Sequence, residues 1–294
     1  NTNGASFNNV CVTINHNSDN YSILIGGGIL FDEITNGSFV KNCYVTFASV
    51  TGVESWNSTF GFIAKSMKNS TMANCYYTSK NNQSIKVKYT VINKFVFGAL
   101  VGSAEDSFIR DVDLSTAPQL DIDSNAGENY IGVVAGTLKN CSLNDITIGT
   151  CQQKMEIDGY KISAKSDFIE NNYAQLNVTL RSTKRNNFVG AVAGAIANDR
   201  TTKGLDTSYP CENLTISNNV IVNNLADLNT AGQIYVGGLF GGAYYNGIWG
   251  FKNVTRNNAK IHGFVNNVWE LGKDDHWSEI PRRVMTSQYM YHMA

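Results

Sequence analysis

The stretch "VGGLFGGAYYNG" (Val236–Gly247) places four glycines within six residues, around a Leu-Phe pair. Three kinds of structure use such glycines: a phosphate-binding loop, a membrane-helix dimerisation motif and a tight structural corner. The chain contains neither the G-x-G-x-x-G nor the G-x-x-x-x-G-K-[ST] pattern of phosphate loops. Polar residues flank the motif within a few positions, which argues against a membrane helix. The stretch therefore indicates a corner where backbones approach closely.

The glycine motif recurs along the chain. Clear copies are "FGALVG" (Phe97–Gly102), "IGVVAG" (Ile131–Gly136), "VGAVAG" (Val189–Gly194) and "VGGLFG" (Val236–Gly241), and looser copies are "IGGGIL" (Ile25–Leu30) and "FGFIAK" (Phe60–Lys65). A second pattern follows each copy, for example "STMANCYYT" (Ser70–Thr78), in which an Asn-rich step precedes alternating apolar and polar residues. Such alternation is typical of a β-strand.

The spacing of these copies predicts the fold. Gly98 and Gly132 are 34 residues apart, whereas Gly132 and Gly190 are 58 apart. We divide the long interval at a degenerate strand, Asp158–Phe168, and assign the polar segment Asn198–Glu212 to a surface insertion. The sequence thus predicts an all-β parallel β-helix (β-solenoid) of about seven repeats of roughly 34 residues. Its handedness stays open.

Two regions follow from the repeat. Residues 1–265 form the predicted solenoid, which starts in mid-repeat, so we expect further chain or a docking subunit upstream. Residues 266–294 break the repeat and are expected to form a C-terminal cap or assembly segment. Aromatic residues near this end are candidates for assembly or sugar contact: Tyr244, Tyr245, Trp249, Trp269 and Trp277. A loop packed over the last coil is the alternative for the first three.

The repeat resembles the GLUG repeat, on the residues "GGLFGG" (Gly237–Gly242), "GAVAG" (Gly190–Gly194) and "LTISNNVIV" (Leu214–Val222). That resemblance implies a large secreted or surface-anchored protein, such as an adhesin-like protein or a bacterial immunoglobulin A peptidase. The zinc-protease motif of those peptidases, H-E-x-x-H, is absent, because the four histidines are scattered. The resemblance therefore bears on architecture and does not carry catalysis over.

Composition narrows the function classes. The chain has 294 residues and a formal net charge of −1, which does not resemble the basic footprint of a nucleic-acid-binding protein. No apolar run is long enough for a membrane span. No cofactor motif is legible, and the six cysteines include no C-x-x-C pair.

Four aspartates form the only acidic pattern that suggests chemistry. Asp111 and Asp113, like Asp121 and Asp123, are spaced to share one face of a strand, with Arg110 on the opposite face. A calcium site or the catalytic carboxylates of a carbohydrate-active β-helix enzyme would use such residues. A solvated strand face is the alternative reading.

Three cysteines, Cys11, Cys43 and Cys75, are spaced by 32 residues and are predicted to stack as buried thiols. Parallel Cβ vectors disfavour a disulfide between stacked coils. Cys141 and Cys151 are close enough in sequence to pair across a loop, and Cys211 lies in the predicted insertion.

Nine N-x-[ST] sequons are candidates for N-glycosylation: Asn20, Asn36, Asn57, Asn69, Asn82, Asn140, Asn177, Asn213 and Asn253. Five of them, Asn36, Asn69, Asn140, Asn213 and Asn253, are predicted to share one repeat phase. The alternative is that turn asparagines followed by strand Ser or Thr generate sequons that carry no sugar.

These observations favour a non-catalytic structural or adhesive segment of an extracellular or cell-surface glycoprotein that assembles end to end into a filament. Expected partners are other copies, other domains of a longer chain, and glycans. The alternatives are a polysaccharide lyase or hydrolase of the β-helix type, or a carbohydrate-binding module.

Overall fold

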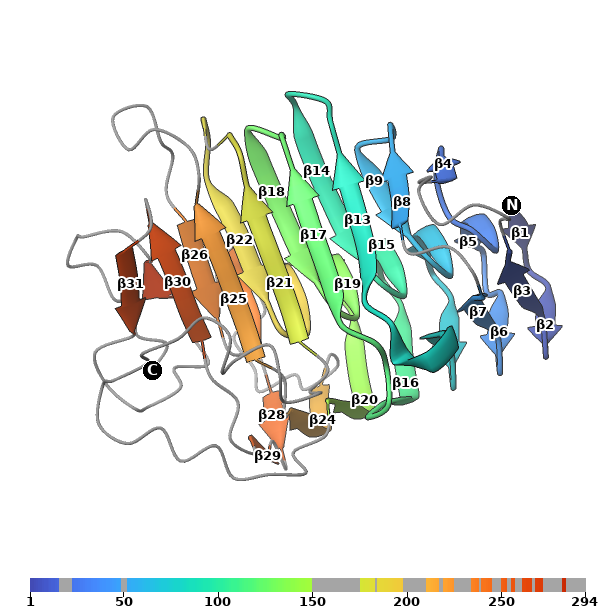
Figure 1. The fold of residues 1–294 in the computed structure, drawn as a ribbon. Coiled ribbons are helices and arrows are strands. Elements are labelled where there is room, and N and C mark those ends of the chain that lie inside the picture. The colour runs from blue at the N-terminus through green and yellow to red at the C-terminus, as the bar shows by residue number, and fades with distance from the viewer. Residues whose placement is uncertain are drawn as a thin grey trace.

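The computed structural model describes residues 1–15, 23–48, 52–149, 175–182, 184–197, 210–216, 219–224, 234–237, 239–244, 250–252, 255–256, 261–265, 268–271 and 282–283. Within them the chain winds into a parallel β-solenoid whose strands fall into five sheets, A to E. Figure 1 shows the coils following one another along a single axis, from the blue strands to the orange ones. The predicted fold class is confirmed.

Each full coil visits the sheets in the order E, A, B, D, and the first three coils add a short strand of sheet C between B and D. Sheet A contains β1 (Thr2–Asn3), β5 (Phe31–Thr35), β10 (Ala64–Lys68), β15 (Val101–Glu105), β19 (Ala135–Lys139), β23 (Ala193–Ala197) and β27 (Phe240–Tyr244). Sheet B contains β2 (Ser6–Asn8), β6 (Phe39–Lys41), β11 (Thr71–Ala73), β16 (Phe108–Leu114), β20 (Ser142–Ile148), β24 (Pro210–Ile216), β28 (Gly250–Lys252) and β29 (Thr255–Arg256).

The remaining sheets complete the coil. Sheet C contains β3 (Cys11–Ile14), β7 (Tyr44–Phe47) and β12 (Tyr76–Ser79), which a 3₁₀ turn, η1 (Lys80–Asn82), follows. Sheet D contains β4 (Ile23–Ile25), β8 (Gly52–Ser55), β13 (Ile85–Tyr89), β17 (Leu120–Ser124), β21 (Gln175–Leu180), β25 (Asn219–Asn224), β30 (Ile261–Val265) and β31 (Val268–Leu271). Sheet E contains β9 (Thr59–Gly61), β14 (Lys94–Gly98), β18 (Glu128–Gly132), β22 (Asn187–Gly190), β26 (Ile234–Gly237) and β32 (Arg282–Arg283).

The glycine motif forms the corner between sheets E and A. A Cβ atom on Gly98 would lie 2.2 Å from the carbonyl oxygen of Val101 and 2.3 Å from the Cα atom of Ala135 in the next coil. A Cβ atom on Gly136 would lie 2.6 Å from the carbonyl oxygen of Gly102 in the preceding coil. Backbone atoms rather than side chains fill this space, so only glycine fits. The prediction of a packing corner is correct.

The corner is itself hydrogen-bonded from coil to coil. The amide of Ala99 donates to the carbonyl of Val133 at 2.9 Å, and the amide of Val134 donates to the carbonyl of Val192 at 2.9 Å. Because all four residues are buried, these backbone groups need protein partners. The next coil supplies them, and the parallel ladder continues through the turn.

The long interval between Gly132 and Gly190 is one coil and not two. Ala135 pairs directly with Ala193, and Leu120 pairs directly with Leu176. The extra residues therefore leave the stack between β20 and β21, and Asp158–Phe168, which lies outside the described residues, does not contribute a coil between these strands. In the described part, six coils carry the glycine motif, one fewer than predicted.

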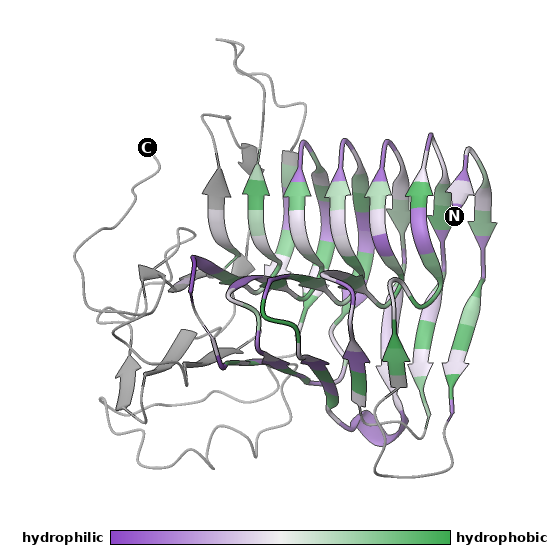
Figure 2. Cartoon of the chain, turned by 90° about the horizontal axis from the view of Figure 1, so that it is seen from above, coloured by the Kyte–Doolittle hydropathy of each residue, from purple (hydrophilic) through white to green (hydrophobic). Residues whose placement is uncertain are grey.

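The interior is a continuous apolar column with one polar section. Figure 2 shows hydrophobic and hydrophilic residues alternating along the strands, as expected when one face is buried. Tyr89 stacks on Phe95 with ring centroids 4.4 Å apart. One coil later Ser124 and Asn129 replace this pair, and their side chains bond to each other at 2.6 Å. The Asn129 amide also donates to Asn187 at 2.8 Å, so the buried polar groups are satisfied.

The direction of pairing changes in the last described strands. β31 pairs antiparallel with β30, and β32 pairs antiparallel with β26, whereas β23 and β27, like the strands before them, pair in parallel. None of the described residues forms a helix with the length and hydropathy needed to cross a bilayer.

Substitution of Gly98 by Ala tests the corner. The methyl group would collide with the backbone of two coils, so we expect a loss of about 3 kcal/mol or more in the free energy of unfolding, measured by urea denaturation. Gly37→Asn is the matched control, because Gly37 has a φ of 77° and a Cβ added there would have no atom within 4 Å, and Asn tolerates this conformation. Equal urea midpoints for Gly98→Ala and the parent would contradict the corner geometry.

Candidate functional site

The corner between sheets A and B carries the predicted sequons and is the most regular polar feature of the described surface. Its residues in successive coils are Gly4, Asn36, Asn69, Asp106 and Asn140, and all five have positive φ angles between 47° and 63°. Asn and Asp tolerate this left-handed conformation better than other residues that have a side chain. The turn therefore explains why asparagine recurs at this position.

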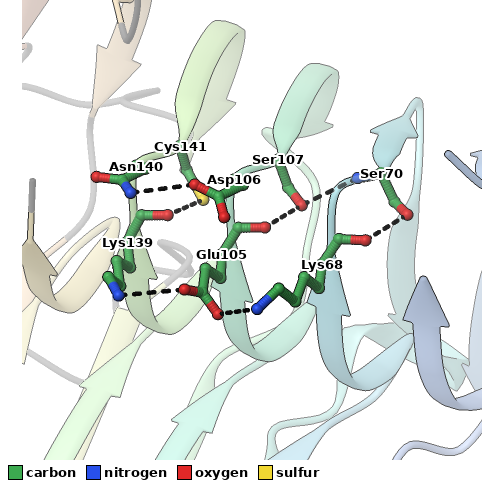
Figure 3. Close-up of polar contacts among 8 residues, drawn as sticks. All are labelled: Lys68, Ser70, Glu105, Asp106, Ser107, Lys139, Asn140 and Cys141. Atoms are coloured by element: carbon green, nitrogen blue, oxygen red, sulfur yellow. Dashed lines mark hydrogen bonds and ion pairs between the residues drawn. The ribbon is translucent and has the colours of Figure 1, made fainter. Parts of the chain in front are cut away.

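Side chains at this corner bond along the solenoid axis. The Asn36 amide donates to Asn3 at 2.8 Å, and the Asn140 amide donates to Asp106 at 3.0 Å. Figure 3 shows the section of the ladder from Ser70 to Cys141. These bonds tie neighbouring coils together outside the backbone ladder.

The residue after the left-handed position stabilises the turn from the inside. Ser70 donates to the carbonyl of Lys68 at 2.8 Å, and Ser107 donates to the carbonyl of Glu105 at 2.6 Å. Cys141 uses its thiol in the same way toward the carbonyl of Lys139, at 3.2 Å. Figure 3 shows the three side chains in equivalent places in successive coils. A small donor, hydroxyl or thiol, is what this place requires.

An ion-pair ladder lines the outer side of the same corner. Glu105 accepts from Lys68 at 3.0 Å and from Lys139 at 3.1 Å, one coil on either side (Figure 3). The hydrogen bond from Lys68 and then that from Lys139 hold the pKa of the Glu105 carboxyl below its ordinary value. All three side chains are partly exposed, so the pairs add modestly to stability.

A second left-handed corner lies at the junction of sheets B and C. Its residues are Asn9, Asn42, Asn74, Asp111, Asp145 and Asn213. The amide of Asn74 donates to Asn42 at 2.7 Å, and that of Asn213 donates to Asp145 at 2.8 Å. Sequence reasoning missed this row. The recurrent Asn or Asp three positions after the first strand residue, as in "FVKN" and "TMAN", is the signal that would have found it.

The structure separates the predicted sequons. Asn36, Asn69 and Asn140 share the A–B corner, but Asn213 lies at the second corner, so its predicted phase is wrong. Asn36, Asn69, Asn82 and Asn213 are exposed, and Asn140 is half-buried. The amides of Asn57 and Asn177 donate across coils, to the Gly26 carbonyl at 2.8 Å and to Asp121 at 3.2 Å. Asn20 and Asn253 lie outside the described residues.

The four aspartates do not form one site. Asp111 and Asp113 lie on β16 in sheet B, whereas Asp121 and Asp123 lie on β17 in sheet D. No group of three or more His, Cys, Asp or Glu residues is arranged to hold a metal ion in the described part of the chain.

Each of these aspartates has a local partner. Asp113 accepts from the amide of Ser115 at 2.9 Å, Asp121 accepts from Gln119 at 2.6 Å, and Asp123 forms a two-point ion pair with Arg181. Asp111 pairs with Arg110 at 3.4 Å, which corrects the prediction that Arg110 faces the opposite side. The positive φ of Asp111, 55°, interrupts the strand alternation on which that prediction was based.

The predicted cysteine ladder is wrong for one of its three members. Cys11 pairs in register with Tyr44 and is exposed, because this coil is 33 residues long at that position. Cys43 and Cys75 are buried and equivalent, each following a left-handed asparagine, and their thiols donate to the carbonyls of Lys41 and Ala73. They repeat the role that Ser70 has at the other corner.

Cys141 and Cys211 are buried too. Cys211 lies in β24, in register with Leu143, so the predicted insertion ends before this strand begins. Burial raises the pKa of both thiols to about 12, which keeps them protonated and unreactive. Cys151 lies outside the described residues, so the predicted Cys141–Cys151 pairing does too.

The aromatic candidates near the C-terminal end fall beyond the described side chains. Tyr245, Trp249 and Trp277 lie outside the described residues, and only the backbone of Tyr244 and Trp269 is described, in β27 and β31.

Comparison with known proteins adds no relative. No protein-family model matches the chain, and neither a curated protein nor a solved structure matches it.

Lowering the pH tests the ion-pair ladder. Because the folded pKa of Glu105 is depressed, its stabilisation is present above the ordinary value of 4.5 and is lost as the pH falls through the folded pKa. We expect Glu105→Gln to lower the melting temperature at pH 7, by less than about 1 kcal/mol in free energy, and to match the parent at pH 2. An identical deficit at both pH values would contradict an electrostatic role.

Glycosylation depends on the accessibility of each sequon. In protein secreted from a eukaryotic host, we expect sugar on the exposed Asn36, Asn69, Asn82 and Asn213, and less at Asn57 and Asn177, whose amides bond across coils. Intact mass before and after glycosidase treatment, followed by peptide mapping, measures the occupancy. Preferential occupancy of Asn57 and Asn177 would contradict this assignment.

Proposed function

We propose that the chain is a non-catalytic structural or adhesive segment of an extracellular or cell-surface protein, built from GLUG-like repeats. The single observation that supports this most directly is the repetition of the outer surface with the coil. At the A–B corner, each coil presents a left-handed polar residue, and neighbouring coils are tied by side-chain bonds such as Asn140 to Asp106. Such a solenoid provides stiffness, length and a periodic surface.

The exposed sequons support the extracellular setting. Asn36 and Asn69 project at the same corner in neighbouring coils, where a glycan would extend into solvent without displacing the core. A row of glycans along one edge would suit a surface glycoprotein.

The edge strands of the first described coil support self-association. β1, β2 and β3 are the terminal strands of sheets A, B and C, and each pairs with the next coil on one side. Their other side offers backbone donors and acceptors in parallel register. The occupant is another solenoid coil, from a longer chain or from a second copy.

The enzyme alternative receives less support from the geometry. A β-helix lyase or hydrolase brings its carboxylates together in one cleft, whereas the two aspartate pairs lie on different sheets, and Asp123 is occupied by Arg181. The aromatic cluster proposed for a carbohydrate-binding module falls outside the described side chains.

Assembly is tested by sedimentation velocity and negative-stain microscopy. We expect concentration-dependent oligomers or filaments, and we expect Phe7→Pro in β2 to shift the protein toward monomer, because proline removes an edge donor and obstructs pairing. Lys88→Pro is unsuitable as a control, since β13 is internal, so Lys80→Ala in η1 serves instead. A strictly monomeric parent at high concentration would rule out self-assembly of this chain.

A further inference from the structure

The side chain of Trp56 is unusually exposed for its size. It follows β8 directly and retains 60% of its accessible surface, whereas most aromatic rings of the first coils are buried in the core. The indole packs against the preceding coil at Gly26, where a Cβ atom would lie 2.5 Å from Cζ2 and 2.9 Å from Cε2. Gly26 therefore makes the room in which the ring lies, and the rest of the ring meets solvent.

Strand register surrounds this ring with polar groups. Leu24, Glu54 and Lys88 are direct neighbours across β4, β8 and β13, which lie side by side in Figure 1. Two residues further along the same strands, and so on the same outer face, come Gly26, Trp56 and Thr90. We call these six residues the Trp56 patch.

The polar members of the Trp56 patch lie within reach of its ring. The Thr90 hydroxyl donates to the Glu54 carboxylate at 3.3 Å. Leu24, Lys88 and Thr90 are exposed and Glu54 is half-buried. The patch thus combines one mounted aromatic ring with a carboxylate, an ammonium group and a hydroxyl, each with capacity for further hydrogen bonds.

This combination selects among ligands. A purely apolar partner would remove Glu54 and Lys88 from water without compensation, which is costly. An anionic polymer such as nucleic acid would meet the Glu54 carboxylate. A neutral sugar matches both parts, because a pyranose with equatorial hydroxyls presents an apolar C–H face to the ring and hydroxyls at its rim to the polar groups.

We propose that the Trp56 patch binds a neutral β-linked oligosaccharide, with one pyranose stacked on the indole and its hydroxyls bonded to Glu54, Lys88 and Thr90. This inference deepens the adhesive part of the proposed function and rests on it only for the biological setting. It does not depend on filament formation, so each can fail without the other.

Isothermal titration of the full 294-residue chain tests the proposal. The protein is first treated with glycosidase, so that no glycan on the neighbouring Asn57 can occupy the ring. The probes are cellohexaose, xylohexaose, chitohexaose and β-1,4-galactohexaose. We expect at least one to bind, and Trp56→Ala to weaken that binding by about tenfold or more, which corresponds to about 1.4 kcal/mol.

Two further variants separate the site from general damage. Gly26→Ala keeps Trp56 but places a methyl group where the ring now lies, so we expect a similar loss of binding with an unchanged melting temperature. Phe108→Ala removes another exposed aromatic ring, 52% exposed on sheet B, and should bind like the parent.

Three results would overturn the proposal. They are no binding of any of the four hexasaccharides by the parent, parent-like binding by Trp56→Ala, and equal losses in Trp56→Ala and Phe108→Ala. Filaments that form normally while no sugar binds would refute this site and leave the structural function intact.

Discussion

The backbones of successive coils pass each other at the corner between sheets E and A without room for a side chain. A Cβ atom on Gly98 would reach within 2.3 Å of the next coil, and one on Gly136 would meet the carbonyl of the coil before it. This contact fixes the rise and the lateral position of each coil relative to its neighbours. Every other row of the solenoid, inside and outside, takes its register from that alignment.

Fixed register turns single residues into columns. Inside, the aromatic pair Tyr89 and Phe95 gives way to the buried hydrogen-bonded pair Ser124 and Asn129, without a break in the strands. Outside, equal spacing lets Lys68, Glu105 and Lys139 alternate in charge along the axis. The same spacing places the serine and cysteine side chains of the corners in equivalent turns, where hydroxyl and thiol donate the same hydrogen bond.

Much of this was legible in the sequence because a solenoid repeats its local chemistry. The glycine copies predicted the corners, and alternation predicted the strands that follow them. The count of coils was not legible, because a chain can leave the stack and return, as it does between β20 and β21. Equivalence within the repeat failed by one residue at Cys11, since spacing along the chain differs from spacing across the sheet when a turn changes length.

The sequence by itself determined the all-β class, the glycine corners and the asparagine-rich turns, because each depends on the conformational preferences of a few adjacent residues. Only the tertiary structure decided which residues stand side by side across coils. It paired Arg110 with Asp111, put Asn213 on a different corner from Asn140, and set Trp56 over Gly26 among Glu54 and Thr90. Those neighbours are 30 or more residues apart in several cases, and strand register, which local sequence does not encode, brings them together.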